Sequence, residues 1–199
     1  MQIYAQLEHI FRILNIDLFD DRLPVPAFTF FSANKKNNWY FKEKNVRQYV
    51  ISINEQELEK DIKEIVQNML HCMVHEYCKV FSISDTSRNG RYHNKRFGEC
   101  AKAHGLVIEH NSKEGIVTTG ITPEVENVIN HKLFDVREKM DAALKAEREK
   151  REKRFERKQE NIIAAYTCIW ECPMCHAKAK ASYNAKLICG YCFVPMNRI

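Results

Sequence analysis

The stretch Met69-Leu70-His71-Cys72-Met73-Val74-His75 places two histidines four residues apart inside an apolar run. Residues four apart lie on one face of an α-helix, so both imidazoles can bind the same metal ion. His93, eighteen residues after the second histidine, is a candidate third ligand. A His-x-x-x-His pair is weak evidence alone, but its apolar neighbours place this one against a core. The stretch predicts a helix with a metal site of three histidines; the alternative is a domain that binds no metal.

Periodicity on both sides of this helix predicts an α+β domain in which helices pack on a small antiparallel sheet. Apolar residues at helical spacing favour one helix over 2–15 and two helices between 55 and 81. A further short helix ends at Gly105, which serves as its C-terminal cap.

Short aromatic and β-branched runs predict the strands. The expected strands of a three-stranded antiparallel meander and of a final hairpin are 27–31, 39–41 and 49–53, then 106–108 and 115–119. Polar connections such as 34–38 separate the strands of the meander.

Three stretches, residues 69–75, 85–97 and 103–106, resemble the SprT-like zinc metalloprotease family. That family is similar to a minimal zincin and is related to the Spartan proteases, which degrade proteins crosslinked to DNA. The likeness covers roughly residues 5–120 and extends to the C-terminal cysteine module. It implies that His71, His75 and His93 bind zinc, that the activity is peptide hydrolysis, and that the partner is DNA or a DNA-bound protein. The 49–53 strand is expected to be an edge strand that pairs with the substrate backbone.

The position of the family's general base, the glutamate of H-E-x-x-H, is occupied by Cys72. Peptide hydrolysis at zinc needs a base to take a proton from the attacking water. Glu76 lies one helical turn further along, about 5.4 Å on the helix axis, which is too far for an efficient substitute. Cys72 is either a small buried hydrophobe or, when deprotonated, a zinc ligand at the open position. The chain is thus expected to be a metallopeptidase with little or no activity, or a pseudoprotease that binds zinc and DNA or protein.

A second cysteine pattern, Cys172-Pro173-Met174-Cys175 and Cys189-Gly190-Tyr191-Cys192, has thirteen residues between its two pairs. Each C-x-x-C directs two thiolates at one cation, and Gly190 is expected to supply the permissive backbone of its turn. The spacing predicts a four-cysteine zinc ribbon with short strands at 179–183 and 186–188. Two disulfides are the alternative, disfavoured because the chain shows no export signal.

The charge distribution predicts how the chain is organised. The net charge is +5, and the positive excess lies after residue 131. The apolar stripe that follows Pro123 stops at residue 145, where a helix can only be solvated. These changes predict a zincin-like domain over 1–122, a charged helical linker over 123–166 and the ribbon over 167–199.

The ribbon's basic and aromatic residues suit a nucleic-acid backbone, although a protein-docking role fits nearly as well. The residues are Lys178, Lys180, Lys186 and Arg198 with Tyr183 and Tyr191. No apolar run is long enough for a membrane span. The chain is expected to be cytoplasmic, with zinc at both sites.

Overall fold

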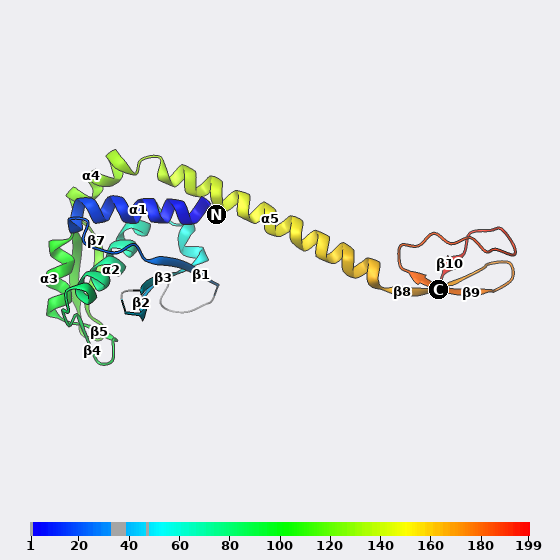
Figure 1. The fold of residues 1–199 in the computed structure, drawn as a ribbon, viewed down its shortest axis with the longest axis horizontal. Coiled ribbons are helices and arrows are strands. Elements are labelled where there is room, and N and C mark those ends of the chain that lie inside the picture. The colour runs from blue at the N-terminus through cyan, green and yellow to red at the C-terminus, as the bar shows by residue number, and fades with distance from the viewer. Residues whose placement is uncertain (1, 33–38, 47) are drawn as a thin grey trace. The chain divides into compact units, whose positions relative to one another are not determined.

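The computed structural model describes residues 2–32, 39–46 and 48–199 (Figure 1). The chain divides into two compact units, residues 1–144 (unit 1) and residues 145–199 (unit 2). Helices and small sheets together make an α+β fold, as predicted. The polar connection expected at 34–38 lies outside the described residues. Among the described helices, none combines the length and apolar character needed to cross a membrane.

Two amphipathic helices form the centre of unit 1. Helix α1, Gln2–Phe19, buries Leu7, Ile10 and Leu14 completely, which confirms the predicted stripe. A 3-10 helix, Glu55–Glu59, precedes helix α2, Ile62–Val80, in the region where two helices were expected. The Asp61 carboxylate caps α2 by accepting a hydrogen bond of 2.8 Å from the Lys63 amide.

The first sheet differs from the predicted meander. Strands β1 (Ala27–Phe31), β2 (Trp39–Asn45) and β3 (Gln48–Asn54) lie in the order β1-β3-β2, and β1 runs parallel to β3. The register pairs Phe28 with Ile51, and the Phe28 ring packs 6.5 Å from Phe11 of α1. This register places Phe28 beside Ile51, so the two side chains enter the core of unit 1 together. Because β3 has a neighbour on each side, the prediction that 49–53 is an edge strand is wrong.

The second sheet and helix α3 carry the loop that returns His93. Strands β4 (Thr86–Ser87), β5 (Tyr92–His93), β7 (Gly115–Ile121) and β6 (Leu106–Asn111) lie in that order. The β6–β7 hairpin confirms the predicted one. Helix α3, Lys95–Ala103, begins at the Asn94 cap, and Gly105 with φ of +87° follows its end.

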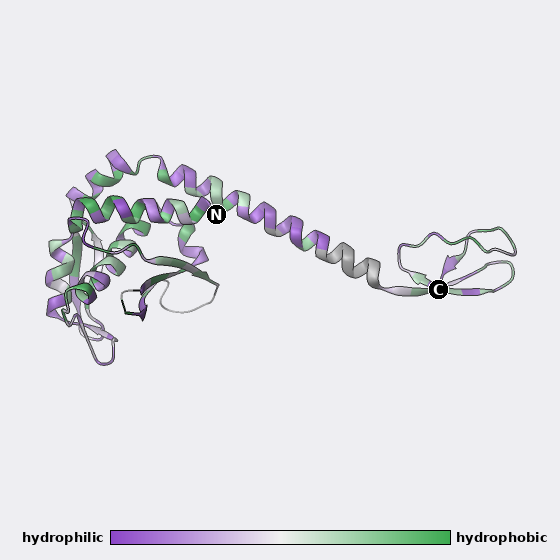
Figure 2. Cartoon of the chain, in the orientation of Figure 1, coloured by the Kyte–Doolittle hydropathy of each residue, from purple (hydrophilic) through white to green (hydrophobic). Residues whose placement is uncertain are grey.

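Unit 1 extends beyond the predicted boundary at residue 122. Helix α4, Pro123–Lys132, and the start of helix α5, Val136–Ala165, bury an apolar stripe in the core of unit 1. The stripe consists of Val125, Ile129, Leu133, Val136, Met140 and Ala143. Over residues 145–150 and 152–157 the side chains of α5 are mostly hydrophilic, as Figure 2 shows. The hydrophilic spacer therefore begins only at residue 145, within α5.

Unit 2 contains a small sheet with the order β10-β8-β9. Strand β8, Thr167–Glu171, pairs antiparallel with β9, Lys178–Ser182, and with β10, Asn197–Arg198. The predicted strand at 179–183 therefore forms with nearly these bounds. The second predicted strand, 186–188, is only an isolated bridge between Ile188 and Pro195.

Candidate metal centres

Three histidines converge in unit 1, as the spacing predicts. Nε2 of His75 lies 3.2 Å from Nε2 of His71 and 3.2 Å from Nε2 of His93. His71 and His75 come from one face of α2, and β5 brings in His93. The ligand nitrogens of the group all lie within 4.8 Å of one another. A tetrahedral zinc with Zn–N bonds of about 2.0–2.1 Å holds its nitrogens about 3.3–3.4 Å apart, so the group fits such an ion.

Each imidazole is oriented through its other ring nitrogen. Nδ1 of His75 lies 2.5 Å from the Asp85 carboxylate, and Nδ1 of His71 lies 3.2 Å from the Thr118 hydroxyl. Nδ1 of His93 lies 2.9 Å from the Ile116 carbonyl oxygen. An Nδ1–H that donates to such an oxygen leaves the Nε2 lone pair free for a metal, which is the usual supporting arrangement of histidine ligands. The sequence offered no signal for these three supporting groups.

The surroundings of the cluster favour the neutral form of two of its imidazoles, those of His71 and His93. Burial and then the neighbouring His75 and His93 lower the pKa of His71 well below its ordinary value. Burial also lowers the pKa of His93. Neutral imidazole is the form that binds a metal, so the lowered pKa values of His71 and His93 favour metal binding.

Aromatic rings hold the histidines in place. The Phe97 ring of α3 lies 5.0, 4.9 and 4.3 Å from the rings of His71, His75 and His93. Phe41, in β2, stacks on His75 at 6.3 Å with an interplanar angle of 11°. One side of the cluster is thus closed by the buried Phe97, and β2 runs past another.

His93 reaches the cluster through a close backbone contact. It pairs with Gly115 across a parallel bridge, and its amide donates to the Glu114 carbonyl oxygen at 3.0 Å. Gly115 has φ of +82°, and a Cβ there would overlap the His93 carbonyl oxygen. Glycine is required at this position both for its backbone angle and for the close approach.

The structure places Cys72 and Glu76 outside the three-histidine group. Cys72 is 1% exposed and belongs to the hydrophobic core, and burial raises the pKa of its thiol well above the ordinary value. Glu76 is fully buried, and among the described residues neither of its carboxylate oxygens has a hydrogen-bond partner. Burial raises the pKa of Glu76 to about 8. The surroundings of Cys72 match its interpretation as a small buried hydrophobe.

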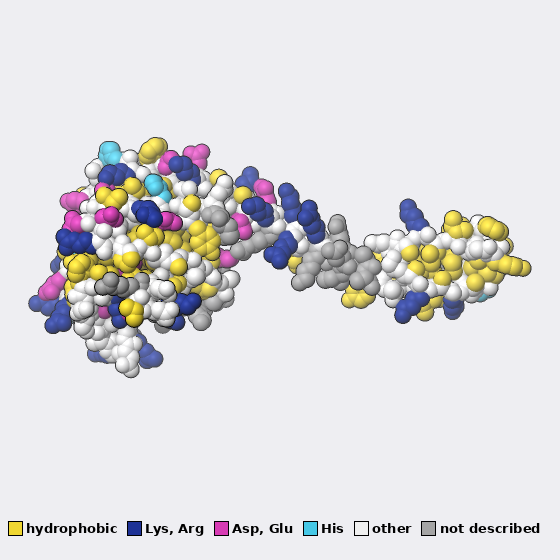
Figure 3. Space-filling model, in the orientation of Figure 1, with side chains coloured by type: hydrophobic (Ala, Val, Ile, Leu, Met, Phe, Trp, Pro, Cys, Tyr) yellow, Lys and Arg dark blue, Asp and Glu magenta, His cyan; other side chains and the backbone are white. Residues whose placement is uncertain are grey.

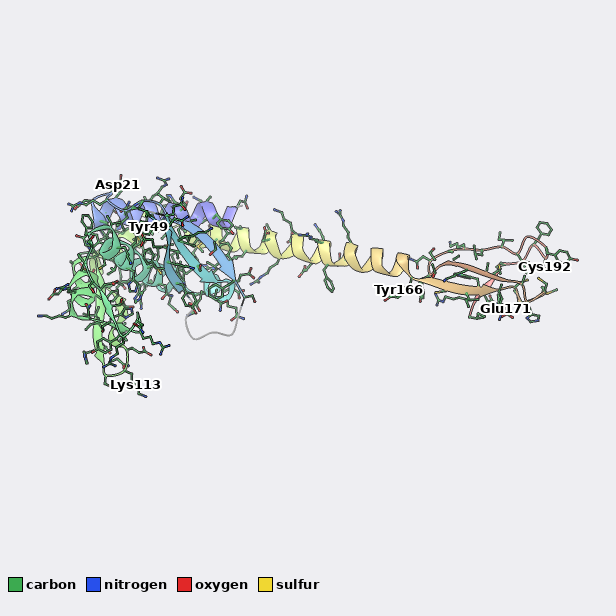
Figure 4. The ribbon with its side chains drawn as sticks, turned by 60° about the horizontal axis from the view of Figure 1, so that its bottom comes forward. Asp21, Tyr49, Lys113, Tyr166, Glu171 and Cys192 are labelled. Carbon is green, nitrogen blue, oxygen red and sulfur yellow. The ribbon has the colours of Figure 1, made fainter. Side chains whose placement is uncertain are left out.

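Four thiols converge in unit 2. Cys172, Cys175, Cys189 and Cys192 form a group whose sulfurs lie within 4.8 Å of one another. Sγ of Cys175 is 3.6 Å from Sγ of Cys189. Zn–S bonds of about 2.3 Å in a tetrahedral site separate the sulfurs by about 3.8 Å, so these thiols also fit one ion. Cys168, in β8, and His176 are not members of the group. Nδ1 of His176 lies 2.7 Å from the Glu171 carboxylate. Figure 4 labels Glu171 and Cys192 on this unit.

The two C-x-x-C turns have the same backbone structure. His176 N donates to the Cys172 carbonyl oxygen at 3.0 Å, and Phe193 N donates to that of Cys189 at 2.8 Å. Both donors have positive φ, 57° for His176 and 55° for Phe193. Gly190 is not among the positive-φ residues, so the expectation that it supplies the unusual backbone angle is wrong. The left-handed residue in each turn is the one that follows the second cysteine.

Comparisons with family models, curated proteins and solved structures found no match to this chain. The candidate function therefore depends on the two ligand groups and on the sequence resemblance.

The surface of unit 2 combines exposed rings with cations. Tyr191 and Phe193 beside the second turn are 85% and 81% exposed, and Figure 3 shows hydrophobic side chains over this unit. The Arg198 guanidinium lies 3.8 Å above the Tyr183 ring. Lys178 pairs with Glu171 at 3.4 Å. Of the basic residues named in the sequence, Arg198 is thus the one that stacks on a tyrosine.

Proposed function

We propose that unit 1 is a zinc-binding domain of the SprT-like metallopeptidase type whose hydrolytic activity is largely lost through Cys72. It binds segments of nucleic-acid-associated proteins, and the zinc ribbon of unit 2 provides contact with the nucleic acid. The observation that carries the proposal is the convergence of three Nε2 atoms, each on an imidazole whose Nδ1 has its own partner.

Zinc is the metal that best suits these donors. Three neutral imidazoles with hydrogen-bonded Nδ1 atoms form a typical site of catalytic zinc, and four thiols form a structural one. When bound at the histidines, zinc supplies Lewis acidity and lowers the pKa of water. Among the described residues no fourth protein ligand joins the three histidines, so a place for a substrate or solvent oxygen is left.

The residues around the histidines support the proposed loss of hydrolytic activity. A general base must lie within hydrogen-bond reach of the water proton that it takes. Cys72 occupies the position of the family's base but is 1% exposed, and Glu76 is buried one turn away. Neither side chain has a ligand atom in the histidine group. In this proposal the three histidines hold the metal, and neither Cys72 nor Glu76 accepts the proton.

Strand β2 is the natural place for a bound peptide. Among the described strands it lies at the edge of the first sheet, since its one neighbour is β3. Its Phe41 stacks on His75, so a peptide that extends the sheet at β2 passes beside the cluster. Backbone hydrogen bonds to an edge strand supply affinity without requiring a particular sequence. This assignment replaces the 49–53 strand expected from the sequence.

The decisive experiment compares the unmodified chain with Cys72→Glu/Glu76→Gln. The second change removes a carboxylate next to the new one, because Glu76 already interacts electrostatically with Cys72. Both proteins are loaded with zinc, checked for zinc content and circular dichroism, and assayed on a DNA-binding protein with and without single-stranded DNA. A general base is worth about 10²–10⁴ in rate, so we expect the variant to be faster by about that factor.

Two controls complete this experiment. Glu76→Gln alone tests whether that carboxylate contributes, and His93→Ala in the double variant should abolish both zinc at the histidines and activity. Hydrolysis by the unmodified chain as fast as by the double variant would contradict the loss of activity. Absence of zinc at the histidines in a folded chain would overturn the proposal for unit 1.

A further inference from the structure

The arginines of unit 1 fall into two groups by their ion pairs. Unit 1 has six described arginines, and three of them pair with carboxylates: Arg12 with Glu8, Arg22 with Asp20 and Arg137 with Asp141. The other three, Arg88, Arg91 and Arg96, have no carboxylate partner among the described residues. All three are exposed. The unpaired guanidinium groups are thus confined to a nine-residue stretch that contains His93.

This stretch presents its charge on a structured part of the domain. Arg88 precedes β5, and its guanidinium lies 4.6 Å above the Tyr92 ring. Arg96 is in the first turn of α3, next to Phe97, which packs on the three histidines. In Figure 3, Lys and Arg side chains lie at the lower end of unit 1, where Figure 1 draws β4 and β5. We call Arg88, Arg91 and Arg96 the arginine edge.

We propose that the arginine edge binds the phosphate backbone of a nucleic acid directly beside the histidine cluster. This inference deepens the proposed function and rests on it for the class of partner. It adds a contact on unit 1 to the one assigned to the ribbon.

The chemistry of the edge favours phosphates. Guanidinium groups bind phosphate oxygens through paired donors, and an arginine without an internal carboxylate keeps all of its donors for a ligand. A nucleic acid presents one negative charge at every nucleotide, so it satisfies neighbouring arginines whatever its sequence. An acidic peptide would need several carboxylates in a row. The Arg88–Tyr92 stack also has a counterpart in unit 2, where Arg198 covers Tyr183.

The test uses the full chain and a short fluorescein-labelled single-stranded oligonucleotide. Arg88→Gln/Arg91→Gln/Arg96→Gln is compared with Arg12→Gln/Arg22→Gln/Lys139→Gln, which removes the same charge from ion-paired positions. Kd is measured by anisotropy over a series of salt concentrations. Each lost phosphate contact lowers the slope of log K against log salt by about 0.7 for single strands, so we expect a drop of about 2 for the edge variant. The control variant should keep the slope of the unmodified chain.

Other outcomes separate this inference from the proposed function. Equal slopes for the edge and control variants would overturn the arginine edge and leave the ribbon contact standing. If the unmodified chain does not bind the oligonucleotide at low salt, a nucleic-acid partner is contradicted for both the ribbon and the arginine edge. The zinc content of the chain would then still test the metal site of unit 1. Loss of polyglutamate binding with unchanged oligonucleotide binding would assign the edge to acidic peptides and contradict the inference. Arg→Lys at all three positions should retain the slope, and zinc content and circular dichroism verify folding.

Discussion

The Asp85 carboxylate lies 2.5 Å from Nδ1 of His75, and both side chains are largely shielded from solvent. Burial raises the pKa of Asp85, but the hydrogen bond with His75 and the other interactions of the carboxylate outweigh burial, so the pKa is lowered overall. The pair therefore fixes the imidazole with Nε2 directed at the cluster. A carboxylate in this place also makes the imidazole a stronger metal ligand.

Replacing Asp85 with alanine should weaken metal binding without unfolding the chain. Loss of such a supporting group lowers metal affinity by about 10–100-fold. Competition with a chromogenic zinc chelator measures the affinity of the histidine site. Asp135→Ala is the control, because Asp135 pairs with Lys139 away from the histidines. Equal affinities for the two variants would contradict a supporting role for Asp85.

Two glycines with nearly equal φ allow a matched test of the backbone contact at His93. Gly115 and Gly90 have φ of +82° and +81°, but of the two only Gly115 has neighbours that an added Cβ would touch, the His93 carbonyl oxygen among them. Gly90→Ala should cost about 1–2 kcal/mol in unfolding free energy, from the left-handed angle alone. Gly115→Ala should cost more and also reduce zinc affinity. Urea denaturation and chelator competition measure the two effects, and equal losses would show that the close approach is unimportant.

Because only the start of α5 packs in the core of unit 1, alanine substitutions in its start and in its later part should differ sharply in their effect on the unfolding free energy. Met140 is fully buried, whereas Phe155 is 62% exposed. Met140→Ala should lower the unfolding free energy by about 2–5 kcal/mol, since it leaves a cavity. Phe155→Ala should change it by less than about 0.5 kcal/mol. Thermal and urea unfolding measure both, and a neutral Met140→Ala would mean that the 123–144 segment is not part of the core of unit 1.

Chelation should unfold the ribbon. Its buried core consists of Cys172, Cys189 and Met196, too few residues for independent stability. Structural zinc contributes about 10–16 kcal/mol in comparable small modules. When a zinc chelator is present, trypsin should cleave the unfolded ribbon after Lys180 and Lys186. In the Cys175→Ser variant the same cleavage should occur without chelator. Cys168→Ser, outside the four-thiol group, is the control, and unchanged resistance in chelator would contradict a structural metal.

Local patterns in the sequence account for much of this structure. The spacing of His71 and His75 predicts their shared face, and the apolar stripe of α1 predicts its buried side. The C-x-x-C pairs predict the four-thiol group because each turn brings its own two sulfurs together. Each of these patterns lies within one helix or one turn, and the four-thiol group forms where two such turns meet.

Relationships between distant segments were not predictable. Strand β1 pairs in parallel with β3 and not with β2, the next strand in the sequence, and short strands give no signal for that choice of neighbour. Thr118, which supports His71, is 47 residues away from it in the sequence. Nothing in the sequence around Asp85 marks this loop residue as the partner of His75. The net charge of unit 1 gave no sign of the arginine edge. Acidic residues elsewhere in unit 1 offset the positive charge of Arg88, Arg91 and Arg96 in that sum.

The contacts of His93 with residues 114–116 have a kinetic consequence. Contacts between distant segments tend to form late, since loop closure comes first. We therefore expect the three imidazoles to meet only after the transition state for folding of unit 1. A ligand that binds only the completed cluster then slows unfolding and leaves the refolding rate nearly unchanged. Bound metal would thus set the lifetime of the native domain and have little effect on how quickly the domain forms.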